Sequence, residues 1–241
     1  KAESIAFRPG NPEDYISLST DINYSPISKW QDSSELKEIH DFISQVITNP
    51  NVKNYIIKLM STFISGSTKN EKFHVWSGSG GNGKSKLIEL LEMCLGDYTC
   101  KMSVQNLTSK RVDAGAANPE LALTQGKRFL NLQEPDEKCK LNVGLMKELT
   151  GGDTIVCRAL YSEPIQFKPQ FKMVLTCNQR PELPCDDDGT WRRVVLIQFN
   201  SKFRPNPKGT YKNYNEEPIS KEEYKQNRAN GIETDYWQPE D

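Results

Sequence analysis

Eight consecutive residues, 78–85, have the types and spacing needed to bind the phosphates of a nucleotide. The run Gly-Ser-Gly-Gly-Asn-Gly-Lys-Ser follows the pattern G-x-x-x-x-G-K-[ST] of a phosphate-binding loop, or P-loop. Glycines let backbone N–H groups close around phosphates, and the N-terminus of the following helix faces the negative charge. The lysine reaches the β- and γ-phosphates, and the hydroxyl coordinates Mg²⁺. We therefore predict a nucleoside triphosphate site made of Gly78, Ser79, Gly80, Gly81, Asn82, Gly83, Lys84 and Ser85.

The residues on both sides of this loop are those that a P-loop requires. The apolar run 73–76, Phe-His-Val-Trp, predicts a buried strand before the glycines. Apolar residues at helical spacing follow the loop, namely Leu87, Leu90, Leu91, Cys94 and Leu95. A glycine-rich turn that matches the pattern by chance is the alternative, and the strand–loop–helix context argues against it.

A second candidate for chemistry is a carboxylate at the end of a predicted strand. Asn118 and Pro119 predict the start of a helix, and residues 129–132, Phe-Leu-Asn-Leu, then predict a short strand that ends at Gln133 and Glu134. In P-loop enzymes an acid after the second core strand lies beside the γ-phosphate, where it binds Mg²⁺ or polarises the attacking water. Glu134 is therefore our candidate base, and an ordinary exposed glutamate is the alternative.

Cationic and aromatic residues gather on a predicted β-hairpin. Asn142 predicts the cap of a short helix, and residues 154–160 and 165–167 then predict two strands joined by a turn. Arg158, Tyr161 and Lys168 lie on or near this hairpin. They provide cations for phosphates and a ring for stacking, the combination that single-strand binders use. On these residues alone, a solvated hairpin without a ligand is an equal alternative.

Polar residues also flank two further predicted strands. Strand 171–177 ends at Asn178, and strand 194–199 is preceded by Arg192 and Arg193. Because α/β sheets bind ligands where polar groups gather at strand ends, these residues are candidates for the nucleotide site.

Two helices are predicted ahead of the P-loop strand. In the first, Asp32 and Glu35 suggest a capping box, and apolar residues at helical spacing continue to Ile47. The second follows Asn49 and Pro50 and is expected to end at Gly66. We expect the apolar stripes of both helices to pack in the core rather than to form a groove for a partner.

Composition limits the classes of function. The 241 residues are 36% hydrophobic and 26% charged, enough for one large domain or a domain with a helical appendage. The formal net charge of −1 gives no global attraction to nucleic acid, so a polyanion would need a local patch or a ring of subunits. The six cysteines form no C-x-x-C pair, so no zinc site is predicted. No apolar stretch approaches the roughly 18 residues of a membrane span, and we expect an intracellular location.

Several motifs in fixed order resemble superfamily 3 helicases, and they match best the poxvirus and giant-virus type, whose members join a primase to a hexameric AAA+ helicase. The similarity of the core covers residues 73–199. Besides the P-loop, the motifs are Asn-Pro-Glu-Leu-Ala at 118–122, Gly-Lys-Arg-Phe at 126–129, Glu134-Pro135, the run 145–153, the run 167–172, Thr-Cys-Asn at 176–178 and Gly-Thr-Trp-Arg-Arg at 189–193. Residues 7–20 are also similar to the segment that precedes the helicase in that group. The resemblance therefore implies a primase domain in the same full-length protein.

The resemblance implies a role for each candidate residue of the nucleotide site. Lys84 and Ser85 would bind phosphate and Mg²⁺, Glu134 would be the acid that activates water, and Asn178 would be the sensor that positions it. Other branches of the superfamily carry two adjacent acids where this chain has Gln133 before Glu134. We therefore expect Ser85 and Glu134, with water, to hold the metal, and ATP to be the nucleotide.

The resemblance also implies a ring of subunits on single-stranded DNA. Arg192 or Arg193 would be an arginine finger that enters the neighbouring subunit's site and adds roughly 10³–10⁵ in rate. The predicted hairpin would be the pore loop, with Arg158, Tyr161 and Lys168 gripping DNA. Only the central channel of such a ring must be positive, which reconciles the near-neutral chain with a polyanionic substrate.

From these observations we predict an α/β fold with a parallel sheet of the P-loop AAA+ type flanked by helices, an N-terminal helical segment and a β-hairpin insertion. Residues 1–66 would precede the helicase, 67–200 form its ATPase core, and 201–241 form a polar tail. The predicted function is an ATP-dependent DNA helicase of viral replication, in the host cytoplasm rather than the nucleus. A P-loop phosphotransferase on a small molecule and an ATP-binding assembly module without hydrolysis are the alternatives.

Overall fold

The computed structural model describes residues 8–108, 117–133, 140–182 and 187–204, and beyond them residues 220, 222, 226, 238 and 239. A five-stranded sheet forms its centre, with all neighbouring strands parallel and in the order β2-β3-β6-β1-β7. The strands are β1 (Phe73–Ser77), β2 (Thr99–Ser103), β3 (Phe129–Gln133), β6 (Lys172–Cys177) and β7 (Val194–Gln198). Two short pairs stand apart from it, β4 (Ile155–Cys157) with β5 (Ile165–Phe167) and β8 (Phe203–Arg204) with β9 (Gln238–Pro239).

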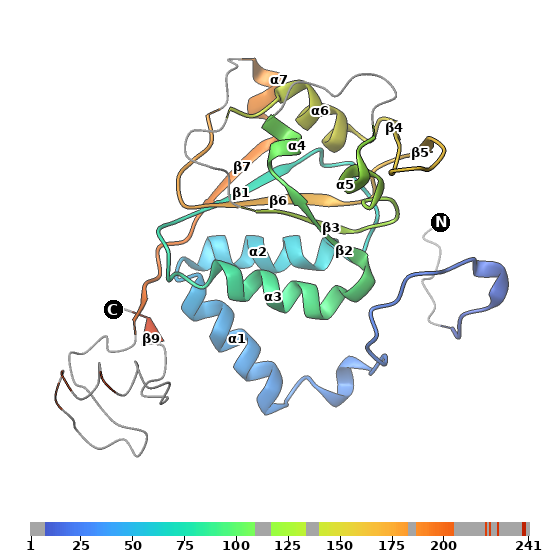
Figure 1. Ribbon diagram of the computed structural model, residues 1–241. Coiled ribbons are helices and arrows are strands. Elements are labelled where there is room, and N and C mark those ends of the chain that lie inside the picture. The colour runs from blue at the N-terminus through green and yellow to red at the C-terminus, as the bar shows by residue number, and fades with distance from the viewer. Residues whose placement is uncertain are drawn as a thin grey trace.

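Helices cover both faces of the sheet (Figure 1). Below it in that view lie α1 (Ser34–Val46), α2 (Pro50–Thr62) and α3 (Lys84–Leu95). Above it lie α4 (Gln105–Thr108), α5 (Pro119–Ala122), α6 (Val143–Gly151) and α7 (Asp188–Trp191). Three 3₁₀ turns complete the described elements, η1 (Pro12–Asp14), η2 (Ile27–Lys29) and η3 (Gly96–Tyr98). The predicted α/β class with a parallel sheet flanked by helices is confirmed.

Alternation along the strands divides the core into two layers. Successive side chains of a strand point to opposite faces, and accordingly Phe73 and Val75 of β1 pack with α6, whereas Trp76 packs with α1, α2 and α3. Both layers contain fully buried residues, so the strands read as continuous apolar runs. This is why the sequence showed them as short apolar stretches rather than as alternating ones.

Local signals set the helix starts with one exception. Asn118 and Asn142 accept hydrogen bonds from backbone N–H groups of α5 and α6, as predicted, and Asn49 caps α2 in the same way. The predicted capping box at Asp32 is wrong. Ser33 is the N-cap of α1, and its hydroxyl oxygen accepts from the backbone N–H of Leu36 at 3.1 Å. The shift of one residue puts a hydroxyl at the cap, and serine is as good there as aspartate.

Three further expectations need correction. Ile39 of α1 is exposed because the first half of this helix extends away from the sheet (Figure 1), and only Ile43 and Val46 within it are buried. Helix α2 ends at Thr62, before Gly66. The predicted strand 154–160 is limited to Ile155–Cys157, since pairing with β5 covers three residues on each side. The division into 1–66, 67–200 and 201–241 stays a prediction, although α1 and α2 share a core layer with the sheet.

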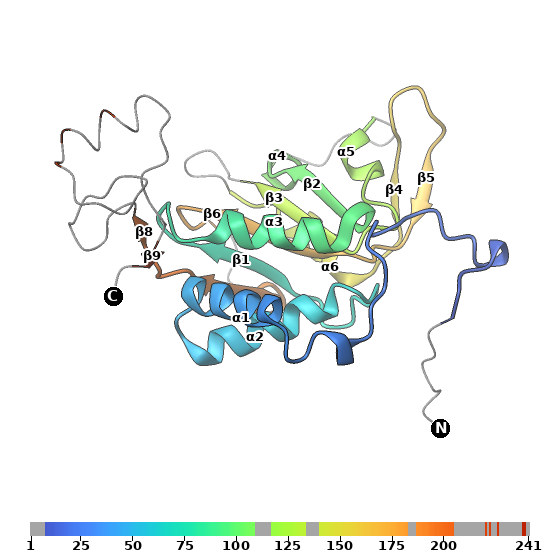
Figure 2. The ribbon, with the colours of Figure 1, turned by 90° about the horizontal axis from the view of Figure 1, so that it is seen from below.

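The segment before α1 lies along the far end of α3 before it leaves the body of the molecule (Figures 1 and 2). The backbone N–H of Asp97 donates to the carbonyl of Ser19 at 2.8 Å, and the hydroxyl of Tyr98 donates to the carbonyl of Leu18 at 3.2 Å. No helix in the described part of the chain is long and apolar enough to cross a membrane.

Candidate functional site

The loop at residues 78–83 connects the C-terminal end of β1 to the N-terminus of α3. We call it the glycine loop. Lys84, the first residue of α3, is buried, and its ammonium donates to the carbonyl of Gly78 at 2.5 Å and to Oδ1 of Asn82 at 3.1 Å. The loop therefore wraps around the lysine head group and leaves the N-terminus of a twelve-residue helix facing outward from the sheet.

Two of the glycines are required by space and by backbone conformation. A Cβ on Gly78 would lie 2.4 Å from Nδ2 of Asn82 and 2.5 Å from the carbonyl oxygen of Phe199. Gly83 has a φ of +81°, and a Cβ there would lie 2.6 Å from Cγ2 of Val46 on α1. The glycine loop is thus pressed between the end of β7 and α1, so its shape depends on both.

A cavity of about 620 Å³ opens over the glycine loop. Residues 80–86 form one side, and Thr176, Cys177 and Asn178 at the end of β6 form another. Because β1 and β6 are parallel neighbours with Ser77 opposite Cys177, the residue after β6 comes beside the loop after β1. Asn178, a predicted site residue, therefore lies on the wall of the cavity, as does the hydroxyl residue Ser85. This volume is in the range of pockets that hold small molecules and cofactors.

Glu134, the predicted base, lies outside the described residues. Strand β3, which precedes it in the chain, is parallel to β6 and ends with Gln133. The described residues contain no group of three or more His, Cys, Asp or Glu side chains that could hold a metal ion by themselves. The oxygen of Ser85 suits Mg²⁺, which prefers oxygen ligands and keeps several waters when it binds substrate phosphates.

The predicted arginine pair lies at the other end of the sheet from the glycine loop. Arg193 immediately precedes β7, and its carbonyl accepts from the backbone N–H of Phe73 at the start of β1. Five residues of β1 separate that point from the glycine loop, roughly 16 Å of strand. Neither arginine can therefore reach the cavity of its own chain.

The two arginines differ in burial although both contact Glu71. Arg193 has only 11% of its side chain exposed, with Nη2 2.7 Å from Oε2 of Glu71 and Nη1 donating to the carbonyl of Gly189 at 2.9 Å. Arg192 has 66% exposed and lies 3.2 Å from the same carboxylate oxygen. Arg193 is thus part of the packed structure, whereas Arg192 stands at the surface.

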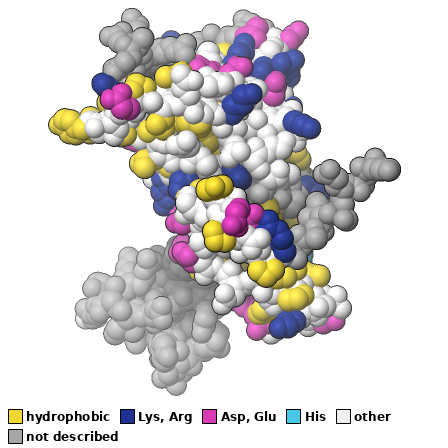
Figure 3. All heavy atoms as spheres, turned by 90° about the vertical axis from the view of Figure 1, so that its right-hand side faces the viewer, with side chains coloured by type: hydrophobic (Ala, Val, Ile, Leu, Met, Phe, Trp, Pro, Cys, Tyr) yellow, Lys and Arg dark blue, Asp and Glu magenta, His cyan; other side chains and the backbone are white. Residues whose placement is uncertain are grey.

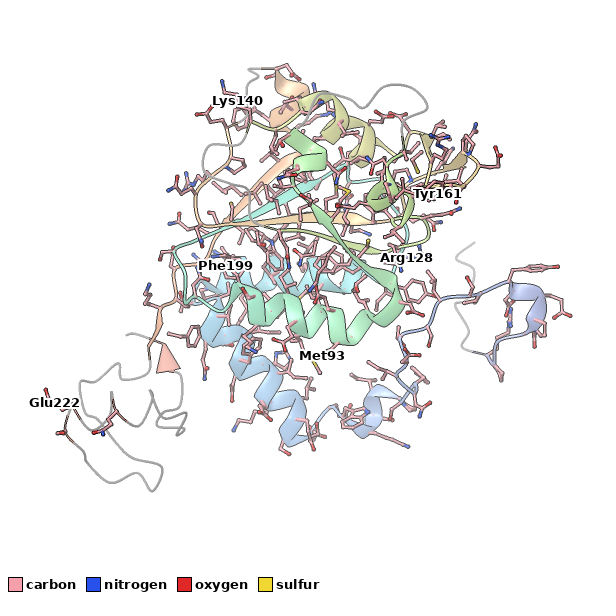
Figure 4. All side chains as sticks on the ribbon, in the orientation of Figure 1. Met93, Arg128, Lys140, Tyr161, Phe199 and Glu222 are labelled. Carbon is pink, nitrogen blue, oxygen red and sulfur yellow. The ribbon has the colours of Figure 1, made fainter. Side chains whose placement is uncertain are left out.

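The three predicted DNA-contacting residues are spread along the β4–β5 hairpin. Tyr161 is fully exposed at its tip with a φ of +57°, and Lys168 is exposed after β5. Arg158 is half-buried at the base, where its carbonyl accepts from the backbone N–H of Asn118 at 2.8 Å. Figure 4 shows Tyr161 pointing away from the sheet, and in Figure 3 hydrophobic side chains gather over the projecting hairpin, where Val156 and Leu160 are also exposed.

A buried histidine lies near the arginine end of the sheet. The ring of His74 in β1 is almost fully buried, and its Nε2 shares a hydrogen bond of 3.0 Å with the hydroxyl of Tyr55. Burial lowers the pKa of His74 to about 4, because a charged imidazolium would lose its hydration there. His74 is therefore neutral at physiological pH and acts as a core residue.

Comparison with known proteins gives three kinds of similarity. A family model described as a family of unknown function (DUF5906) matches residues 76–193, which include the glycine loop, the hairpin and the arginine pair. Over 210 residues the chain is 46% identical to a protein of Acanthamoeba polyphaga mimivirus named "Putative helicase L207/L206", with 87% of this chain and 22% of that protein covered. It is 27% identical over 193 residues to the African swine fever virus protein named "Putative primase C962R", with 79% of this chain and 20% of that protein covered. The chain thus spans about a fifth of the length of these viral relatives.

Among solved structures, the apo structure of the NrS-1 C terminal region (305-718) has the same fold over much of the chain. The TM-score is 0.55 at 15% identity, and the alignment covers 68% of this chain and 38% of that one. At this identity the similarity concerns the fold alone. The parallel sheet flanked by helices therefore occurs in a second protein of very different sequence.

The structure brings together some predicted residues and separates others. The glycine loop and Asn178 share one cavity, while Arg192, Arg193 and the hairpin lie toward the opposite end of the sheet. Sequence reasoning missed Glu71, which holds both arginines, and Phe42 and Phe203, which line the cavity. Glu71 has a φ of +49°, but no sequence signal marks it.

Proposed function

We propose that this chain is the ATP-driven motor of a viral DNA helicase of superfamily 3. Its AAA+ core would work as a ring, a hexamer of identical subunits around single-stranded DNA. In the full-length protein the motor would be joined to a primase domain. It would act at the viral replication site in the host cell, in the cytoplasm rather than the nucleus. The names of the viral relatives, "Putative helicase" and "Putative primase", support this role.

The observation that carries the proposal is the separation of the glycine loop from the arginine pair by the length of β1. A site that needs both groups can form only between two copies of the chain, with the glycine loop of one facing the arginine end of the next. Such head-to-tail contacts generate a closed ring when the rotation from one subunit to the next closes on itself. The strand order β2-β3-β6-β1-β7, with the glycine loop after β1 between β6 and the edge strand β7, is the order expected for an AAA+ core.

Exposure selects Arg192 as the finger in this proposal. Arg192 is mostly exposed and has a surface ion pair to exchange, whereas the side chain of Arg193 is largely buried and donates to a backbone carbonyl. Surface pairs of this kind are worth about 1 kcal/mol or less, so a phosphate could replace Glu71 as the partner of Arg192. Arg193 would then position the segment that carries Arg192.

The nucleotide in the proposal is ATP with Mg²⁺. Gly78 to Gly83 would supply backbone N–H groups, Lys84 would exchange its present carbonyl and amide partners for the β- and γ-phosphates, and Ser85 would ligate the metal. Glu134 would orient or deprotonate the attacking water, and Asn178 would position it from the cavity wall.

The β4–β5 hairpin would grip DNA. Its tip carries exposed Tyr161, on which a base can stack, and exposed Lys168 follows β5 at the base of the hairpin, where a phosphate can pair. Arg158 at the base would contribute only if its half-buried guanidinium turns outward. Six such hairpins around one channel would concentrate a positive charge that the near-neutral chain lacks as a whole.

ATPase rate measured against protein concentration, with and without single-stranded DNA, tests the proposal. We expect specific activity to rise as subunits associate and to rise further with DNA. A specific activity that does not change with protein concentration would contradict the proposal that the active site forms between subunits. Glu134→Gln should bind ATP but lose turnover, and unchanged turnover in this variant would favour an assembly module that binds ATP without using this acid.

A further inference from the structure

The cavity over the glycine loop extends beyond the part that phosphates would fill. Its remaining wall consists of Phe42 and Gln45 from α1 and Phe203 from β8, all outside the glycine motif. Both phenylalanines are half-buried, with one side packed against the core layer that contains Trp76 and Leu87. The cavity therefore has a polar side at the loop and an aromatic side next to it.

The segment after β7 is held tightly against the glycine loop. The backbone N–H of Phe199 donates to the carbonyl of Ser77 at 2.8 Å, and that of Phe203 donates to the carbonyl of Gly81 at 2.6 Å. The ammonium of Lys202 donates to the carbonyl of Gly80 at 3.0 Å. Phe199, labelled in Figure 4, lies where this segment leaves the sheet. Three hydrogen bonds, two of them between backbone groups, thus hold the segment that carries Phe203 against the loop.

The end of α1 is fastened to the same segment. The hydroxyl of the buried residue Ser201 lies 2.6 Å from the carbonyl oxygen of Gln45 and 3.0 Å from that of Val46. Val46 in turn packs against Gly83. Phe42 is one helical turn before Val46, so the contacts that fix Val46 also fix Phe42. Two segments about 160 residues apart in sequence therefore build one rigid wall.

We propose that this wall is the subsite for the base of the nucleotide, with the base held against the rings of Phe42 and Phe203 and its edge read by the amide of Gln45. The inference rests on the proposed function, because the glycine loop must hold the triphosphate for the base to lie there. Aromatic rings bind any base through its flat face. The wall thus supplies affinity, and the side chain of Gln45 supplies the choice of base.

The chemistry of Gln45 favours adenine over guanine. An amide offers one acceptor oxygen and one donor nitrogen side by side, which match the amino group and N7 of adenine. Guanine offers two acceptors on the corresponding edge and is better matched by two donors, as in arginine. Gln45 is exposed at the mouth of the cavity, so its amide can turn to meet the base.

Binding of ATP, GTP and inorganic tripolyphosphate to the chain tests the inference, because tripolyphosphate occupies the glycine loop without a base. We expect Phe42→Ala and Phe203→Ala to weaken ATP binding about tenfold or more, the loss typical of one base–aromatic stack, and to leave tripolyphosphate binding unchanged. Gln45→Ala should bring the affinities for ATP and GTP closer together. Tyr15→Ala, which removes an exposed ring far from the cavity, is the matched control and should change nothing.

Phe42→Leu and Phe203→Leu keep most of the apolar volume, so they provide the same test if the alanine variants fail to fold. They should also lose ATP affinity without losing tripolyphosphate affinity, because leucine has no flat π face. Equal losses for ATP and tripolyphosphate would overturn the inference and make the phenylalanines supports of the loop. Unchanged ATP affinity in all four variants would overturn it as well and leave the proposed function intact. If the wild-type chain bound neither ligand, both proposals would fall.

Discussion

Separate replacement of the two neighbouring arginines should have opposite consequences for stability and turnover. Arg193 is almost buried and makes a 2.7 Å contact with Glu71 and a 2.9 Å hydrogen bond to Gly189. Hydrogen bonds of charged groups contribute about 1.5–3 kcal/mol each, and Arg192 remains as a second partner for Glu71. We therefore expect Arg193→Ala to lower the free energy of unfolding by about 2–4 kcal/mol.

Arg192→Ala should leave the free energy of unfolding within about 1 kcal/mol of the wild-type value, because its guanidinium is mostly exposed and pairs with a surface carboxylate at 3.2 Å. If Arg192 meets the triphosphate of a neighbouring subunit, the same variant should lose roughly 10³-fold or more in kcat while it still binds ATP. Urea unfolding gives the first quantity, and DNA-stimulated ATPase measurements give the second.

A mixing experiment distinguishes a contact between subunits from one within a subunit. Lys84→Ala and Arg192→Ala should each be inactive alone. In an equal mixture, about a quarter of head-to-tail interfaces would pair an intact lysine with an intact arginine, so activity should return in part. Wild-type turnover in Arg192→Ala, or no recovery of activity in the mixture, would refute the role of Arg192 as an arginine finger. If Arg192→Ala and Arg193→Ala lowered the free energy of unfolding equally, the reasoning from burial would be refuted.

Three further predictions concern the structure that supports the site. Gly83→Ala should abolish binding of both ATP and tripolyphosphate, because the new Cβ would lie 2.6 Å from Val46 in a backbone conformation that disfavours alanine; retained binding would show that α1 can move. The folded pKa of His74, about 4, is below its ordinary value of 6.5, so the unfolded chain takes up a proton first as pH falls. Stability should drop by about 3 kcal/mol between those two pH values, and urea unfolding of His74→Gln should lack that part of the dependence. Asn49→Ala should lower the free energy of unfolding by about 1 kcal/mol in thermal unfolding, because the N-terminus of α2 loses its cap. Asn51→Ala, two residues later and inside the helix, should lower it less.

The predictions that were confirmed rest on signals that lie close together in the chain. Asn118 and Asn142 cap the next helix because the amide oxygen is the nearest acceptor for its first N–H groups. The hairpin strand 165–167 was predicted because two apolar residues, Ile165 and Phe167, alternate with Gln166 after a turn with a proline. The short edge strand β2, with the sequence Thr-Cys-Lys-Met-Ser, was missed, because only Met102 in it is fully buried and no apolar run marks it.

Only the part of the site that is continuous in sequence was predicted, because local signals act over a few residues. The glycine motif carries its whole geometry within a few residues, so sequence was sufficient to single out residues 78–85. The partners that shape the loop come from α1 and from the end of β7, and they have no common local pattern. Phe203 and Gln45 line the cavity only because tertiary packing brings their segments to the glycine loop.

By itself the sequence determined the strand–loop–helix unit, most helix starts and the set of residues able to do chemistry, because hydrogen bonds to nearby backbone and the spacing of apolar residues act over a few positions. Tertiary structure alone decided which of these residues meet. Parallel pairing put Asn178 beside the glycine loop and both arginines one strand length away, and the packing of β7 against β1 buried Arg193 while it left Arg192 at the surface. Burial and distance between segments far apart in sequence depend on the assembled sheet, so no local pattern could have set them.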